Sequence, residues 1–126
     1  MRPTTKTSAA ILVRPRIYLG KGLAIGPGKI DLLRTVAELK SIAAAARKLS
    51  IPYKRAWVLI DSLNQGFGKP VVETTSGGKG GGGASLTTLG QQLVEKYDAL
   101  ERRLNAQAAE ELAAVRALTS QSCCHK

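Results

Sequence analysis

The spacing of apolar residues changes from a strand pattern to a helix pattern within the first third of the chain. Four apolar residues stand at odd positions in RIYLGKGLAI, residues 16–25, which predicts one face of a strand. The sequence GPG, residues 26–28, ends this strand. From residue 29 to about residue 40, apolar residues recur every three or four positions, which predicts a first helix with a broad apolar face.

Two further helices separated by a tight turn are expected next. Ser41 can accept hydrogen bonds from the free amides of a short helix, IAAAARKLS, that ends near Leu49. Pro52 is tolerated in the first turn of a third helix, PYKRAWVLIDSLNQ, because its missing N–H would have no partner there. The small alanines of the second helix allow the third to approach closely.

The third helix has an apolar side and a basic side when its residues are placed about 100° apart. We expect the apolar side to be core, and we assign Trp57 to the core rather than to a contact surface. The apolar side holds Ala56, Ile60 and Leu63, flanked by Tyr53, Trp57 and Leu59, and the opposite side holds Lys54, Arg55, Val58, Asp61 and Ser62. Two short helices of which the second begins with exposed cations are typical of a helix-turn-helix, although other helical proteins contain similar pairs.

A hairpin is expected after the third helix. Residues 69–74 (KPVVET) are strand-like, and residues 84–87 (ASLT) form a returning strand after a run of glycines. A helix-turn-helix followed by a hairpin is the arrangement of a winged helix. The sequence therefore predicts a mainly α fold with a small β-hairpin.

The glycine run has two possible interpretations. GKGGGG, residues 78–83, matches G-x-G-x-x-G, but a dinucleotide site requires the glycines to lead from a strand into a helix, and here they lead into a strand. A P-loop is excluded because Lys79 is followed by glycine rather than Ser or Thr. A wing tip explains the run better, since glycines bring backbone amides close to DNA phosphates and Lys79 adds charge. A merely flexible hairpin tip remains the alternative.

The last helix carries an apolar stripe that predicts a homodimer. Thr87 is a candidate cap, and no Pro or Gly interrupts the sequence from just after Gly90 to about Leu118. A stripe this long exceeds what a small domain can cover, although the helix could instead fold back on its own domain. The residues expected at the dimer interface are Leu93, Tyr97, Leu100, Leu104, Leu112 and Val115. A dimer would place two recognition helices about 34 Å apart, one turn of DNA.

Charge is concentrated in the first half of the chain. The 126 residues have a net charge of +10, and residues 1–60 hold twelve basic and two acidic residues against seven of each in residues 61–126. This asymmetry indicates a polyanionic partner, because Lys and Arg displace counterions from a phosphate backbone. A basic surface kept only for solubility is the alternative. We expect residues 1–15 to form a flexible basic arm.

Several functions are not expected. No apolar run is long enough for a signal peptide or a bilayer span, so a soluble, cytoplasmic protein without membrane contact is expected. Cys123 and Cys124, beside His125, lack the spacing of a staple or a zinc site, and residues 119–126 are expected to be a disordered tail. The sequence offers no catalytic arrangement, metal site or cofactor site.

Three motifs resemble the ModE family of molybdate-responsive bacterial transcriptional regulators. They are YKRAW at 53–57, GGKGGGGA at 77–84 and LTTLG at 86–90, within a similarity that covers roughly residues 16–100. The helix-turn-helix is also similar, more distantly, to LysR-type regulators. The resemblance implies a winged helix-turn-helix that dimerises through the terminal helix with help from the N-terminal strand.

The chain departs from the ModE pattern in two places. Pro52 stands where the family usually has a serine, so the cap of the third helix is expected to be lost. The sequence also ends where the molybdate-binding domains of the family begin. We therefore expect a stand-alone regulator that has no molybdate-binding domain of its own.

The predicted function is a sequence-specific, homodimeric transcriptional regulator that binds double-stranded DNA. We expect a winged helix-turn-helix over residues 16–90 and a dimerisation helix over residues 88–118. Lys54 and Arg55 are expected in the major groove with Tyr53 and Val58 beside them. The expected backbone anchors are Ser41, Arg47 and Lys48, with Lys79 in the wing. An architectural, nucleoid-type protein with little sequence preference is the alternative, and the sequence identifies no effector.

Overall fold

The computed structural model describes residues 13–20, 22–75 and 83–124, with residues 120–124 described by their backbone alone. The chain divides into two units, which we call the core unit, Pro15–Asp98, and the terminal unit, Met1–Arg14 with Ala99–Lys126. The core unit contains both hairpins and the first three helices. No helix among the described residues is both long and apolar enough to cross a membrane.

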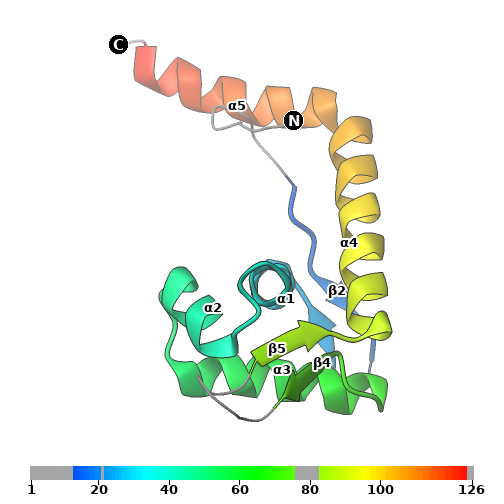
Figure 1. Cartoon of the computed structure of the whole chain (residues 1–126). Coiled ribbons are helices and arrows are strands. Elements are labelled where there is room, and N and C mark those ends of the chain that lie inside the picture. The colour runs from blue at the N-terminus through cyan, green and yellow to red at the C-terminus, as the bar shows by residue number, and fades with distance from the viewer. Residues whose placement is uncertain (1–12, 21, 76–82, 125–126) are drawn as a thin grey trace. The chain divides into compact units, whose positions relative to one another are not determined.

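The first strand segment is a small hairpin rather than the single strand that the sequence predicts. Strand β2 (Ile17–Tyr18; Figure 1) pairs antiparallel with β3 (Ala24–Ile25), and Ile17 lies opposite Ile25. Gly20 and Gly22 have φ angles of 84° and 77°, a region that glycine enters at little cost. The alternating apolar residues therefore belong to two strands joined by a glycine turn, which places both isoleucines on the same face.

Three helices follow in the predicted order: α1 (Pro27–Leu39), α2 (Ile42–Leu49) and α3 (Tyr53–Phe67). Helix α1 begins at Pro27, whose missing N–H removes one unsatisfied donor. The Ser41 hydroxyl accepts a hydrogen bond from the Ala44 amide at 3.0 Å, which confirms the predicted cap of α2. Pro52 precedes α3 without a side-chain cap, as expected from its replacement of serine.

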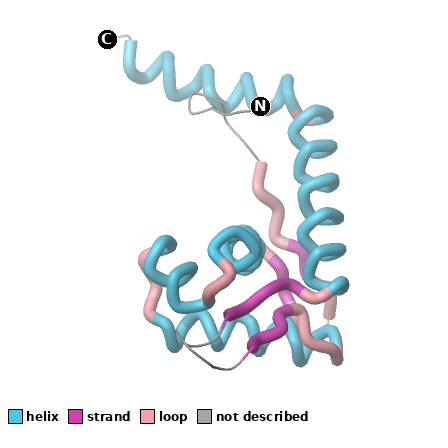
Figure 2. The backbone as a smooth tube through the Cα atoms, in the orientation of Figure 1, coloured by secondary structure: helices cyan, strands magenta, loops and turns pink. Residues whose placement is uncertain are grey.

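The wing is present in the described residues. Strands β4 (Val72–Thr75) and β5 (Gly83–Leu86) pair antiparallel and form a short hairpin (Figure 2). The Ala84 amide donates to the Lys40 carbonyl at 3.0 Å, which ties β5 to the end of α1. This hairpin after α3 confirms the winged-helix prediction. The wing tip, including Lys79, lies outside the described residues.

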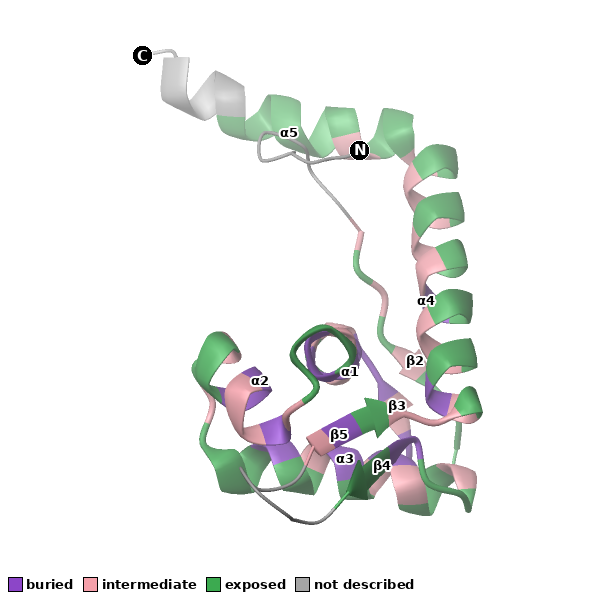
Figure 3. Cartoon of the chain, viewed as in Figure 1, coloured by how far each residue is buried: buried purple, intermediate pink, exposed green. Residues whose placement is uncertain are grey.

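The inward faces of the elements in the core unit form one apolar core (Figure 3). Helix α4 (Thr88–Gln107) contributes Tyr97, which is 1% exposed and donates its hydroxyl proton to the Pro15 carbonyl at 2.7 Å. Tyr97 was predicted at a dimer interface, and this assignment is wrong because the ring is already buried by its own chain. The sequence pattern identified an apolar stripe without identifying what covers it. The largest fully buried side chains are Tyr97, Ile25, Ile30, Leu32, Leu33, Ile60, Leu63, Val36 and Val71.

The terminal helix is divided rather than continuous. Helix α4 ends at Gln107, and helix α5 (Ala109–Cys124) follows and continues beyond the predicted end at residue 118. One turn before the division, the Asn105 side chain donates to the Glu101 carbonyl at 2.7 Å and also pairs with the backbone of Val13. Side chains that bond into a helical ladder are a known cause of bends. The helix is divided although the sequence contains no Pro or Gly there, and backbone hydrogen bonds from Ala108 to Leu104 and from Leu112 to Ala108 continue across the division at 2.9 and 2.8 Å. Thr87 does cap α4, since its hydroxyl accepts from the Gly90 amide at 3.1 Å.

Candidate nucleic-acid interface

Helix α3 presents a basic and partly apolar face to solvent. Ala56, Ile60 and Leu63 are buried, so the 3.6-residue period turns Lys54 and Val58 outward. Arg55 is exposed, and the Val58 side chain is 52% exposed. The predicted division of α3 into a core side and a solvent side is therefore confirmed for these residues.

An aromatic pair extends this exposed face at the start of α3. The rings of Tyr53 and Trp57 meet edge to face, with centroids 6.3 Å apart and planes at 84°. They are 53% and 37% exposed. Trp57 was predicted to be core, and this is wrong because its position lies at the margin of the apolar side, where the ring packs on Tyr53. The pair offers aromatic surface beside the cations of α3.

The two edges of α3 face different parts of the core unit. On one edge, the Asn64 side-chain oxygen accepts from the Val71 amide at 2.8 Å, just before the wing begins. On the other edge, the Ser62 hydroxyl accepts from the Lys29 ammonium at 3.2 Å, near the start of α1. The helical period places Trp57 on the wing edge with Asn64, and Arg55 on the α1 edge with Ser62. The outward face of α3 therefore lies between the wing and the first turn of α1.

Helix α2 contributes cations near this face. Arg47 is exposed, and the Lys48 ammonium lies 3.4 Å from the Glu38 carboxylate. Both partners of that pair are more than half exposed, and such pairs contribute little energy, so Lys48 can exchange one anionic partner for another. The Ser41 hydroxyl is half-buried and already accepts the capping hydrogen bond, which leaves its own proton for an acceptor.

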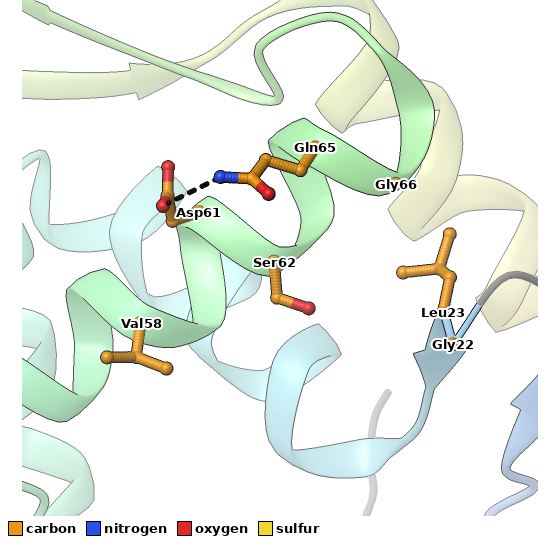
Figure 4. A pocket seen from close by; sticks show the side chains of 7 residues that line it. All are labelled: Gly22, Leu23, Val58, Asp61, Ser62, Gln65 and Gly66. Carbon is orange, nitrogen blue, oxygen red and sulfur yellow. Dashed lines mark hydrogen bonds between the residues drawn. The ribbon is translucent and has the colours of Figure 1, made fainter.

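An open hollow of about 510 Å³ lies beside α3, next to the turn of the first hairpin (Figure 4). The Asp61 carboxylate stands at its rim and accepts a hydrogen bond from the Gln65 amide at 3.3 Å. The hollow is lined by Gly22, Leu23, Val58, Asp61, Ser62, Gln65 and Gly66. Asp61 marks the end of the basic part of α3, which comprises only its first two turns.

Two cations near α3 were missed by the sequence reading. Lys29 donates to the Ala24 carbonyl at 2.6 Å and to Ser62, and the Arg16 side chain packs across Gly26 at the start of α1. Burial, followed by the charges of Arg16 and Arg55, lowers the pKa of the Lys29 ammonium. These residues are distant from α3 in sequence, so no spacing rule connects them.

The described residues contain no group of acidic, histidine or cysteine side chains that could hold a metal ion. The side chains of Cys123, Cys124 and His125 lie outside the described part of the chain.

Comparison with known proteins places this architecture in a regulatory family. Residues 28–91 match the model described as "Bacterial regulatory helix-turn-helix protein, lysR family". The DNA-binding domain of CbnR, solved in a complex with DNA, aligns with a TM-score of 0.51 and 23% identity over 73% of this chain and 95% of that domain. That likeness supports the winged-helix fold.

Curated relatives include ModE proteins. The transcriptional regulator ModE of Haemophilus influenzae is 38% identical over 86 residues, which are 68% of this chain and 34% of that protein. The DNA-binding transcriptional dual regulator ModE of Escherichia coli (strain K12) is 44% identical over 84 residues, 67% of this chain and 32% of that protein. The molybdenum-pterin-binding protein MopB of Rhodobacter capsulatus is 40% identical over 80 residues, 64% of this chain and 30% of that protein.

The matched segment spans about a third of the length of each of these relatives. The family model, residues 28–91, begins in α1 and includes α2, α3, the wing and the start of α4. A regulatory family also agrees with the expectation that the chain is not an enzyme. The family model covers 64 of the 126 residues, and the chain therefore belongs to the lysR family of bacterial regulatory helix-turn-helix proteins.

Proposed function

We propose that this chain binds double-stranded DNA through α3 and acts as the DNA-binding part of a transcriptional regulator. The observation that supports this most directly is the exposed first half of α3, which presents Lys54 and Arg55 between the wing and the start of α1. A helix inserted in the major groove reads bases with residues of its N-terminal half. Only that half of α3 is basic, because Asp61 follows on the same outward face.

The side chains of α3 suit different parts of a base pair. Lys54 and Arg55 can donate to the O6 and N7 acceptors of guanine, and Val58 can contact a thymine methyl group. The Tyr53–Trp57 pair provides apolar contact on the wing edge of the groove. Ser41 and Arg47 would hold the backbone, and Lys48 would do so after leaving Glu38.

The proposed functional form is a homodimer held by α4 and α5. In the terminal unit, Leu100, Val115 and Leu118 are 36%, 56% and 66% exposed. Leu104 and Leu112, which belong to the same apolar stripe, are half-buried. Exposed apolar side chains at three- and four-residue spacing suit burial against a second helix. Leu93 packs partly against the core of its own unit, and Tyr97 takes no part.

The relatives suggest which genes to examine first. Proteins named ModE and MopB are similar to this chain over the winged helix. Genes of molybdenum uptake and use are therefore the first candidates for its targets. A cytoplasmic location follows from a role in transcription.

Selection of bound duplexes from a random DNA library tests the proposal. At about 150 mM salt, nonspecific backbone binding is weakened, so base-specific sites dominate the recovered pool. We expect a motif with two-fold symmetry whose half-sites are about one helical turn, roughly 10 base pairs, apart. Recovery of no motif despite tight binding at low salt would contradict sequence-specific regulation and favour the architectural alternative. Failure to bind any duplex would contradict both functions.

A further inference from the structure

A cluster of three cations lies on the α1 edge of α3, on the opposite edge from the wing. Lys29 is joined to α3 by its hydrogen bond to Ser62, and Arg55 lies two turns before Ser62 on the same edge. The Arg16 side chain lies over Gly26, and its Nη1 atom is 3.5 Å from where a Cβ on Gly26 would stand. We call Arg16, Lys29 and Arg55 the cation cluster.

The fold holds these charges together without a neutralising carboxylate among the described residues. No ion pair joins a carboxylate to these three side chains in the described part of the chain, and Asp31 instead pairs with Arg34 at 3.0 Å. Burial, and then the neighbouring charges of Arg16 and Arg55, lower the pKa of Lys29, because a like charge disfavours the protonated form. Bringing three cations together costs free energy that a bound anion would recover.

The cluster also has donors to spare. Lys29 uses two of its three ammonium protons, on the Ala24 carbonyl and the Ser62 hydroxyl, which leaves one for a ligand. Arg16 and Arg55 are exposed, and the Arg16 guanidinium lies 5.9 Å from the centre of the Tyr18 ring without an ion pair in the described structure. The adjoining first turn of α1 has no acidic residue and no side-chain cap, so its amides add positive potential.

We propose that Arg16 and Lys29 of this cluster bind a backbone phosphate of DNA on the α1 edge of α3, next to the base that Arg55 reads. This inference rests on the proposed function and adds a contact on the side of the groove opposite the wing. With α3 in the major groove, the two strands that border the groove lie on either side of the helix. The wing and aromatic pair would face one strand, and the cation cluster would bind the other. Arg16 and Lys29 would therefore fix how far α3 enters the groove and would contribute to every duplex equally.

Gly28 offers a substitution that tests the cluster without disturbing the fold. A Cβ at Gly28 meets no atom within 4 Å, so a side chain there enters open space beside Lys29. Gly28→Glu adds a carboxylate one residue before Lys29 in the first turn of α1, where acidic residues stabilise a helix. Gly28→Ala is the matched control without charge. Arg16→Gln removes one cation of the cluster, and Lys96→Gln, at an exposed position on α4, removes one cation elsewhere.

The measurement is the affinity for several 30-base-pair duplexes of unrelated sequence between about 50 and 300 mM KCl. Each phosphate contact contributes about 0.9 to the slope of log affinity against log salt. Gly28→Glu and Arg16→Gln should each reduce that slope by about 1 and weaken binding roughly 3–10-fold near 0.1 M salt on every duplex. Gly28→Ala and Lys96→Gln should match the unchanged chain. Thermal unfolding checks that all four variants remain folded.

The outcomes separate this inference from the proposed function. If the unchanged chain binds DNA and all four variants share its slope, the cation cluster does not bind the backbone and the inference alone is overturned. If the unchanged chain binds no duplex at low salt, the proposed function fails and this inference fails with it. The second probe is inorganic phosphate, which is added to the unchanged chain while the NMR signals of the Gly28 and Lys29 amides are followed. Saturation at millimolar phosphate with unchanged DNA slopes would assign the cluster to a free anion and overturn the DNA assignment.

Discussion

Replacing Gly90 with alanine is expected to destabilise the core unit through a single backbone contact. Gly90 lies in the first turn of α4, and a Cβ there would stand 2.2 Å from the Val71 carbonyl oxygen. That oxygen accepts a hydrogen bond from the Thr87 amide at 3.0 Å. Either the start of α4 or the chain leading into the wing must therefore move by about 1 Å, since ordinary contacts begin near 3.4 Å.

The magnitude follows from three effects. Forcing an extra carbon into a packed site typically costs about 1–3 kcal/mol. Losing the Thr87–Val71 hydrogen bond would add about 1 kcal/mol. Alanine recovers about 1 kcal/mol because it is a better helix former than glycine. The expected net loss is about 1–3 kcal/mol, which corresponds to a fall in Tm of roughly 4–20 °C for a domain of this size.

Urea unfolding followed by circular dichroism and Trp57 fluorescence measures this loss. Gly28→Ala is the matched control, because it makes the same substitution in a helix where no atom lies within 4 Å of the new Cβ. It should leave stability unchanged or raise it by up to about 1 kcal/mol. If Gly90→Ala proves as stable as Gly28→Ala, the close approach of α4 to Val71 is not a constraint and the reasoning fails.

Three further predictions concern binding, assembly and pH. Arg55→Ala should weaken binding to the preferred DNA site by about 1–3 kcal/mol and relax base preference at one position; equal losses on all sequences in an anisotropy titration would contradict base reading by Arg55. Replacing Val115 and Leu118 together with glutamate should convert the proposed dimer to a monomer in sedimentation velocity, because both are exposed on α5, and an unchanged sedimentation coefficient would exclude this face from the proposed interface. Burial, and then the charges of Arg16 and Arg55, make the pKa of Lys29 lower in the folded chain than in the unfolded chain. At pH values between these two pKa values, the unfolded chain therefore binds more protons than the folded chain. The stability of the unchanged chain relative to Lys29→Met should therefore rise as pH increases towards the ordinary lysine pKa of 10.5, and a fall measured by urea unfolding would contradict this sign.

Local sequence rules were sufficient for the helix-turn-helix and the wing. Ser41 and Thr87 cap helices where their position before an apolar run predicts. The buried residues of α3 follow the 3.6-residue period because the core covers one continuous side. The two strands of the wing flank the glycine run as expected. In each case the determining interaction is between residues close in sequence or on one face of one element.

The errors arose where the outcome depends on residues distant in sequence. Tyr97 is buried because the Pro15 carbonyl lies within reach of its hydroxyl, 82 positions away. Asn105 bonds to the backbone of Val13 and to its own helix, which an unbroken helical pattern does not reveal. Lys29 and Arg16 reach the edge of α3 only after the first hairpin and α1 have packed. Trp57 is exposed because its apolar partner is Tyr53 rather than the core.

Whether the outward face of α3 binds DNA can be tested by following the NMR signals of the backbone amides as a duplex is added. A 15N-labelled chain is titrated with a duplex that contains a selected site, and the amide signals are followed residue by residue. We expect the largest changes on residues 53–61, with smaller ones at the caps of α1 and α2. Changes confined to α5, with α3 unaffected at saturating DNA, would contradict it.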